Sequence, residues 1–205
     1  MPGTGASPRI PAGTSPRIPA GASPRIPAAW LARCPRASQP PDAHTAAELT
    51  ALLRLLRAAP ADGIAIGHGR HPASAAAAQA LAAAWGETGG AVLAVVSWPA
   101  GPASWLRPAR RLAGAQPGAW VIADHPAGCA QLARRLAGQP GWAAARTFGF
   151  ASVATTDLIS LAGPGLLDGM TGATAAGATW RIADGVLDAD DSSRAELARA
   201  IRSRL

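Results

Sequence analysis

The chain has 205 residues and a formal net charge of +7, with 23 glycines, 19 prolines and no tyrosine. Its two cysteines lie 95 positions apart, which excludes a disulfide-built scaffold and a zinc site made of cysteines alone. Glycine, proline or charge interrupts the apolar runs before the ~18 residues that a transmembrane helix needs, so we expect no stable membrane insertion. The length suits one domain.

The positive charge is concentrated at the beginning of the chain. Residues 1–41 contain five arginines and no acidic residue, whereas the remaining chain contains 14 arginines against 12 acidic residues. The larger part is therefore close to neutral and carries no basic stripe. We accordingly expect no nucleic-acid partner.

The first segment is built on an octapeptide repeat. The sequence GASPRIPA at 5–12 recurs at 13–20 with one change and again at 21–28. Two prolines per copy oppose both a helix and a central strand, and one isoleucine per copy buries too little surface to offset chain entropy. We expect a disordered arm over 1–41, without the apolar stretch of a secretory signal, followed by a domain over 42–205.

Helical and strand patterns alternate from residue 44 onward. The first helix has a capping-box spacing between Thr45 and Glu48. The run at 91–96 is continuously apolar, which is typical of a parallel strand buried on both faces. We predict helices at 46–59, 72–85, 103–114, 127–137, 157–162 (capped by Thr156) and 192–204, strands at 63–67, 91–96, 120–123 and 147–151, and a hairpin or terminal strand over 180–187.

This alternation predicts an α/β fold with a doubly wound parallel sheet. Ligands of such sheets bind beyond the carboxyl ends of the strands, where His68, His71, Asp124 and His125 are expected. These side chains either converge on a ligand or are simply polar residues at loop starts, and we favour the second reading over a metal site. The dinucleotide fingerprint, the phosphate loop and the nucleophile elbow are all absent from the sequence. Cys129 is expected to be a small buried hydrophobe.

The order of elements over 44–174 resembles the second lobe of type I periplasmic binding proteins, the branched-chain amino-acid-binding type of ABC transporter substrate-binding protein. The segments that carry the resemblance are the helix 46–59 with GIAIGH at 63–68, WLRPARRL at 105–112, WVIADH at 120–125, TFGFAS at 147–152, and LISLAG at 158–163 with LDGM at 167–170.

The resemblance implies a small-molecule solute such as an amino acid, an ABC permease as a possible partner, an extracytoplasmic location, and no catalysis, metal or other cofactor. It implies that the solute contacts come from His68, His71, Asp124, His125 and Ser152. The tyrosines that the family commonly uses in this lobe have no counterpart here.

Two alternatives belong to other classes. GIAIGHGR at 63–70, followed by an alanine-rich helix, also resembles the opening of small tetrapyrrole metal chelatases, in which His68 would bind the metal with help from His71 or His125. The third hypothesis is a cytoplasmic ligand-sensing or partner-binding α/β domain.

Overall fold

The computed structural model describes residues 25–99, 101 and 104–189. Seven strands form one sheet in the order β2-β1-β3-β4-β5-β6-β7. Pairing is parallel from β2 to β5 and antiparallel from β5 to β7. The strands are β1 (Gly63–Gly69), β2 (Ala91–Trp98), β3 (Ala119–Ala123), β4 (Thr147–Gly149), β5 (Thr171–Ala173), β6 (Thr179–Ala183) and β7 (Val186–Ala189).

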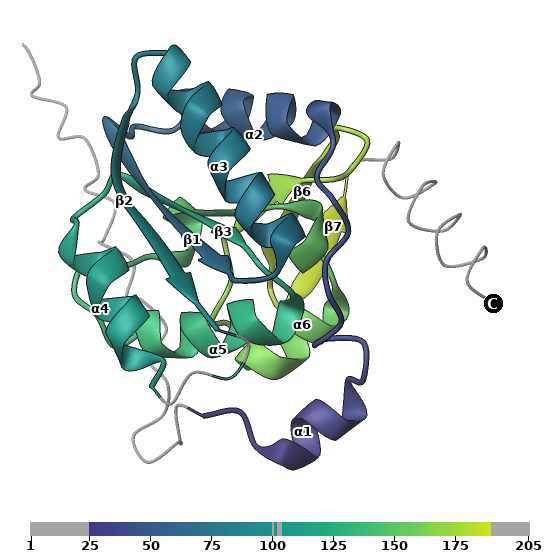
Figure 1. Cartoon of the computed structure of the whole chain (residues 1–205). Coiled ribbons are helices and arrows are strands. Elements are labelled where there is room, and N and C mark those ends of the chain that lie inside the picture. Colours follow the sequence, from purple (N-terminus) through teal and green to yellow (C-terminus); the bar gives the residue numbers. More distant parts are fainter. Residues whose placement is uncertain (1–24, 100, 102–103, 190–205) are drawn as a thin grey trace, which may run out of the picture.

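Helices cover both faces of this sheet (Figure 1). The helices α2 (Ala46–Ala58) and α3 (Pro72–Glu87) pack over one face, in a core that includes Leu52, Ile66 and Leu81. The other face carries α4 (Leu106–Gly114), α5 (Pro126–Leu136) and α6 (Thr156–Ala162), around Trp120 and Ile122. The predicted doubly wound α/β fold is confirmed.

The beginning of α2 follows from its first four residues. The Thr45 hydroxyl accepts a hydrogen bond from the backbone N–H of Glu48, and the Glu48 carboxylate accepts one from the backbone N–H of Thr45. This reciprocal pair satisfies two donors that a helix start otherwise leaves unpaired. The predicted capping box is therefore present.

Strand β2 is an edge strand rather than a strand buried on both faces, so that prediction was wrong. Alternate residues along it are exposed, and Leu93 and Val95 keep 48% and 47% of their surface in solvent. The strand order places the second strand of the chain outside the first. A continuous apolar run does not distinguish an edge from a central position, because both contain the same residue types.

The structure also differs from the expected disordered arm over residues 25–41. Ile26 and Ala37 are buried, and the short helix α1 (Ala28–Arg33) lies between them. The backbone N–H of Ile26 donates to Gln131, and that of Ala127 donates to the Ala37 carbonyl. The isoleucine of the third octapeptide is buried because α5 supplies both apolar surface and hydrogen-bond partners. Residues 1–24 lie outside the described residues.

Several boundaries differ from the predictions. Strand β4 ends at Gly149 because the chain enters a 3₁₀ turn at Ala151–Val153, and α6 is capped by Thr155 rather than Thr156. Helix α4 begins at Leu106, three residues later than predicted. β5 was not predicted, whereas the hairpin β6–β7 was. The predicted helix 192–204 lies outside the described residues.

No helix in the described part of the chain is both long and apolar enough to cross a bilayer.

The buried position of Ile26 gives a stability prediction. Ile26→Ala should lower the free energy of unfolding by about 2–4 kcal/mol, because a buried isoleucine leaves a cavity against α5. Arg33→Ala is the control, since Arg33 is exposed in the same segment and should change stability by less than about 0.5 kcal/mol. Urea unfolding followed by circular dichroism measures both. Equal effects of the two variants would show that Ile26 does not pack here.

Candidate functional site

The polar loops that follow the parallel strands meet at one edge of the sheet. Residues 68–71 follow β1, residues 124–126 follow β3 and residues 150–152 follow β4. Helices α3 and α5 begin at the same edge, because each follows a strand directly. In doubly wound folds this edge is where ligands bind.

Asp124 is the most enclosed polar group at this edge, with 2% of its surface exposed. Its Oδ2 accepts a hydrogen bond from the Trp98 indole at 2.6 Å, and its Oδ1 accepts one from the backbone N–H of His125 at 2.8 Å. Burial raises the pKa of this carboxyl, while the nearby His125 and the Trp98 hydrogen bond act in the opposite direction. Asp124 therefore ties the end of β2 to the end of β3.

Two glycines make room for this carboxylate. A Cβ atom at Gly69 or at Gly128 would overlap the Asp124 carboxylate oxygens. The end of β1 and the first turn of α5 can therefore close around Asp124 only where no side chain is present. The result is a carboxylate enclosed by protein groups.

His71 and His125 have the same structural role. Each is the residue before a helix that begins with proline, and each ring accepts a backbone N–H through Nδ1. The distance is 3.3 Å from Ala73 to His71 and 2.9 Å from Gly128 to His125. Both Nδ1 atoms must be unprotonated to accept these bonds. The histidines predicted as ligand groups therefore cap α3 and α5.

The remaining two predicted residues bond to backbone. His68 Nδ1 lies 2.7 Å from the Gly69 carbonyl oxygen and donates to it, and the Ser152 hydroxyl donates to the Asp124 carbonyl at 2.9 Å. His68 and His125 both act electrostatically on Asp124. The structure thus groups His68, Asp124, His125 and Ser152 and places His71 at the start of α3.

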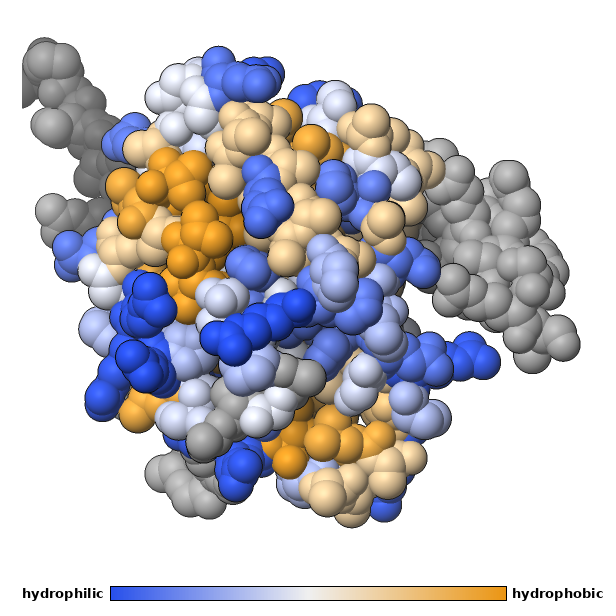
Figure 2. All heavy atoms as spheres, in the orientation of Figure 1, coloured by the Kyte–Doolittle hydropathy of each residue, from blue (hydrophilic) through white to orange (hydrophobic). Residues whose placement is uncertain are grey.

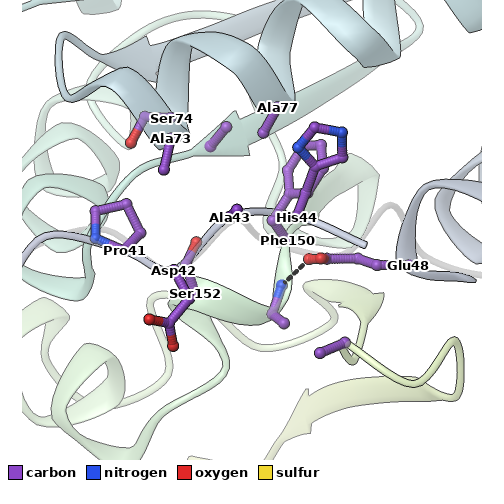
Figure 3. A pocket seen from close by; sticks show the side chains of 13 residues that line it. Pro41, Asp42, Ala43, His44, Glu48, Ala73, Ser74, Ala77, Phe150 and Ser152 are labelled. Atoms are coloured by element: carbon purple, nitrogen blue, oxygen red, sulfur yellow. Dashed lines mark hydrogen bonds between the residues drawn. The ribbon is translucent and has the colours of Figure 1, made fainter. Parts of the chain in front are cut away.

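A cavity of about 120 Å³ lies beside these polar side chains (Figure 3). It is enclosed between the carboxyl edge of the sheet and residues 41–44, here called the N-terminal segment. Of the five predicted residues, only Ser152 lines it. Its walls come from residues 41–44, from Glu48, from the first turns of α3, from the end of β3 and from the loop after β4. The lining residues include Asp42, His44, Ser74, Ala77 and Phe150.

Glu48 connects two walls of the cavity. One carboxylate oxygen accepts the N–H of Thr45, and the other accepts the N–H of Ala151 in the loop after β4. The Thr45 hydroxyl in turn donates to the Ala175 carbonyl. Burial raises the pKa of Glu48, and the two backbone hydrogen bonds act to lower it. The dashed line in Figure 3 marks the bond to Ala151.

Two polar atoms in the wall of the cavity are buried without a hydrogen-bond partner, namely Ser74 Oγ and His44 Nδ1. Ser74 is 2% exposed and lies in the first turn of α3. A buried hydroxyl without a partner costs about 1–3 kcal/mol. A bound solute or water in the cavity is the natural partner for both atoms.

Sequence reasoning missed Ser74, His44 and the cavity role of Glu48. Ser74 lies in the first turn of the helix predicted over 72–85, which follows the strand predicted over 63–67, and that position was the available signal. His44 and Glu48 gave no such signal, because they line the cavity only through the packing of α2 beside β4 and β5.

Comparison with known proteins identifies the class of fold. No protein-family model matches the sequence, and no curated protein matches it either. A substrate-binding periplasmic protein from Ralstonia solanacearum superposes with a TM-score of 0.57 at 18% identity, over 65% of this chain and 37% of that one. A protein assigned to branched-chain amino acid ABC transport, from Rhodospirillum rubrum, gives 0.53 at 18% identity, over 62% and 36%.

An extracellular ligand-binding receptor from Rhodopseudomonas palustris gives a TM-score of 0.52 at 16% identity, over 68% of this chain and 39% of that one. The chain therefore spans little more than a third of the length of these structures. The resemblance to a lobe of type I periplasmic binding proteins is confirmed at the level of the fold.

The chelatase hypothesis gains no support. Among the described residues, no group of three or more histidine, cysteine, aspartate or glutamate side chains is placed to hold a metal ion. His68, the expected ligand, is bonded to the Gly69 carbonyl through Nδ1. Cys129 is buried in α5, as predicted, and burial raises the pKa of its thiol.

The tie between Trp98 and Asp124 gives a second prediction. Trp98→Phe should lower the free energy of unfolding by about 2–3 kcal/mol, because it leaves a buried carboxylate oxygen without its donor. Trp105→Phe is the matched control, since that indole packs against Trp98 with ring centroids 6.1 Å apart. Thermal and urea unfolding compare the two. If both variants lose the same stability, the hydrogen bond to Asp124 contributes nothing specific.

Glu48 gives a third prediction, on pH. Its pKa is raised above the ordinary 4.5 in the folded state, so the folded chain binds the proton more tightly than the unfolded chain does. The stability that protonated Glu48 contributes is present below pH 4.5 and is lost as the pH rises through the folded pKa. The stability advantage of the wild type over Glu48→Gln should therefore shrink as the pH rises.

The advantage below pH 4.5 should be about 1–3 kcal/mol, because glutamine has one acceptor oxygen for the two backbone donors. Urea unfolding between pH 4 and 7 measures the difference, with Glu87→Gln on the exposed end of α3 as the control. A difference that grows with pH would contradict the burial of this carboxyl.

Proposed function

We propose that the chain binds a small solute in the cavity between the N-terminal segment and the carboxyl edge of the sheet. The single observation that supports this is the Ser74 hydroxyl, which is buried at that edge and has no hydrogen-bond partner. An unpaired buried hydroxyl is unfavourable unless a ligand completes it. The activity proposed is binding rather than catalysis.

The lining defines the chemistry of the solute. Ser74 and His44 offer hydrogen-bonding atoms, while Ala73, Ala77 and Phe150 form apolar walls. At about 120 Å³ the cavity is smaller than the sites of ~300–1,000 Å³ that hold drug-sized ligands. We therefore propose a small polar solute, with small amino acids as the first class to test.

The relation to transport is part of the same proposal. The matched proteins are described as substrate-binding, ligand-binding or branched-chain amino acid ABC transporter proteins. We propose that this chain acts as a solute-binding component related to an ABC uptake system, with a permease as partner and an extracytoplasmic location. Ser152, on the cavity wall, stays among the proposed solute contacts. Contacts from His68, His71, Asp124 and His125 remain predictions.

Thermal unfolding with a panel of amino acids tests binding, followed by calorimetry on any solute that raises the melting temperature. Ser74→Ala should lower the affinity for that solute about five- to tenfold, because one hydrogen bond of about 1 kcal/mol is lost. The same variant should leave the solute-free protein equally or more stable, because it removes an unpaired hydroxyl. These opposite effects distinguish a ligand contact from a structural one.

Ser160→Ala is the matched control, because its hydroxyl bonds within α6 and lies outside the cavity. It should leave the affinity unchanged. Absence of a shift with every amino acid, or equal affinity of the Ser74→Ala variant, would refute binding at this cavity.

A further inference from the structure

Strand β2 forms one edge of the sheet and is left open on its outer side. It pairs with β1 along one side, and within residues 25–99, 101 and 104–189 the strand order places no strand beyond it. In this part of the chain its outer backbone groups therefore have no partner strand. Natural proteins seldom leave a long edge strand in this state, because it is a template for pairing with another chain.

The side chains of β2 offer none of the usual protection. The strand reads AVLAVVSW and contains no charged residue and no proline. Leu93 and Val95 are about half exposed, and Figure 2 shows a hydrophobic area where β2 runs in Figure 1. A bulge opposite Ile64–Ala65 is the one irregular feature, and the register from Ala94 to Trp98 is continuous.

The parts of this chain outside the structure do not suit this edge. Residues 1–24 contain six prolines, with no proline-free stretch longer than five residues, so they cannot supply a strand of matching length. Residues 190–205 continue from β7, at the opposite edge of the sheet, and seven of these sixteen residues are charged. Neither segment complements an uncharged apolar strand.

We propose that the edge of β2 is a self-association surface, on which β2 of a second copy pairs antiparallel across a twofold axis. An uncharged strand is compatible with its own copy, because no like charges meet. Pairing centred on Ala94 places Leu93 of one protomer opposite Val95 of its partner. The two seven-stranded sheets then continue into one another.

The size of the surface is that of a small interface between protein copies. Eight residues at ~3.3 Å each give an edge of ~26 Å. With side chains on both faces, such a strand pair buries on the order of 1,000 Å² in total, near the lower limit for a specific interface. We expect a weak dimer that dissociates on dilution, because small interfaces are typical of transient association.

Sedimentation velocity of the purified chain over about 5–500 μM tests the proposal. The mass should rise from that of the 20.5 kDa monomer toward the dimer. Val95→Lys should weaken association at least tenfold, because each lysine would lie opposite the apolar Leu93 of the partner and the two like charges would be diagonal neighbours across the paired strands. Val186→Lys on β7 is the matched control, since Val186 is 59% exposed at the opposite edge and should leave association unchanged.

Hydrogen exchange provides a second measurement that does not depend on a variant. Amides of residues 91–98 should become more protected as the concentration rises, whereas those of 186–189 should not. The proposal would be overturned if the chain stayed monomeric at every concentration, even if a different protein were found to bind the β2 edge. It would also be overturned by dimerisation that Val95→Lys leaves intact, or that Val186→Lys abolishes.

Discussion

The arrangement of the carboxyl edge of the sheet depends on the two hydrogen bonds that the Glu48 carboxylate accepts. This carboxylate accepts backbone N–H groups from two segments that are 106 positions apart, at Thr45 and at Ala151. One bond begins α2, and the other turns the chain away from the sheet after β4. Without this carboxylate, the N-terminal segment and the loop after β4 would lose their shared attachment. The cavity between them exists because this attachment fixes both walls.

Asp124 has a similar structural role at the same edge of the sheet. It too is a buried carboxylate whose oxygens accept donors from protein groups, here the Trp98 indole and the His125 backbone. Burial raises the pKa of both acids, and hydrogen bonds oppose the rise in both. These two acids already have partners, whereas Ser74 Oγ and His44 Nδ1 in the cavity wall have none.

Local chemistry explains which parts of the fold the sequence predicts. The capping box of α2, the strand–helix alternation and the buried Cys129 depend on neighbouring residues, and all three are present. The edge position of β2 and the packing of Ile26 depend on partners that are distant in sequence. The predicted site residues do lie at the expected edge. Their hydrogen bonds depend on neighbours that the sequence pattern does not reveal. His71 and His125 accept backbone N–H groups at the starts of α3 and α5, whereas Asp124 accepts the indole N–H of Trp98.

The octapeptide repeat illustrates the same limit. Three copies have nearly the same sequence, yet the isoleucine of the third is buried against α5. Composition predicts disorder for all three copies equally, because they contain the same residue types. It carries no information about the position of the third copy next to the domain. The N-terminal segment that follows, over residues 41–44, forms one wall of the cavity.

The most direct test of solute binding at this edge is an amide NMR titration of the intact chain with the amino acid that stabilises it most. We expect the largest chemical-shift changes at residues 41–44, 73–77 and 150–152, in the segments that line the cavity. Saturating changes that instead fall at the amino ends of the strands would contradict this expectation, as would their complete absence with every amino acid.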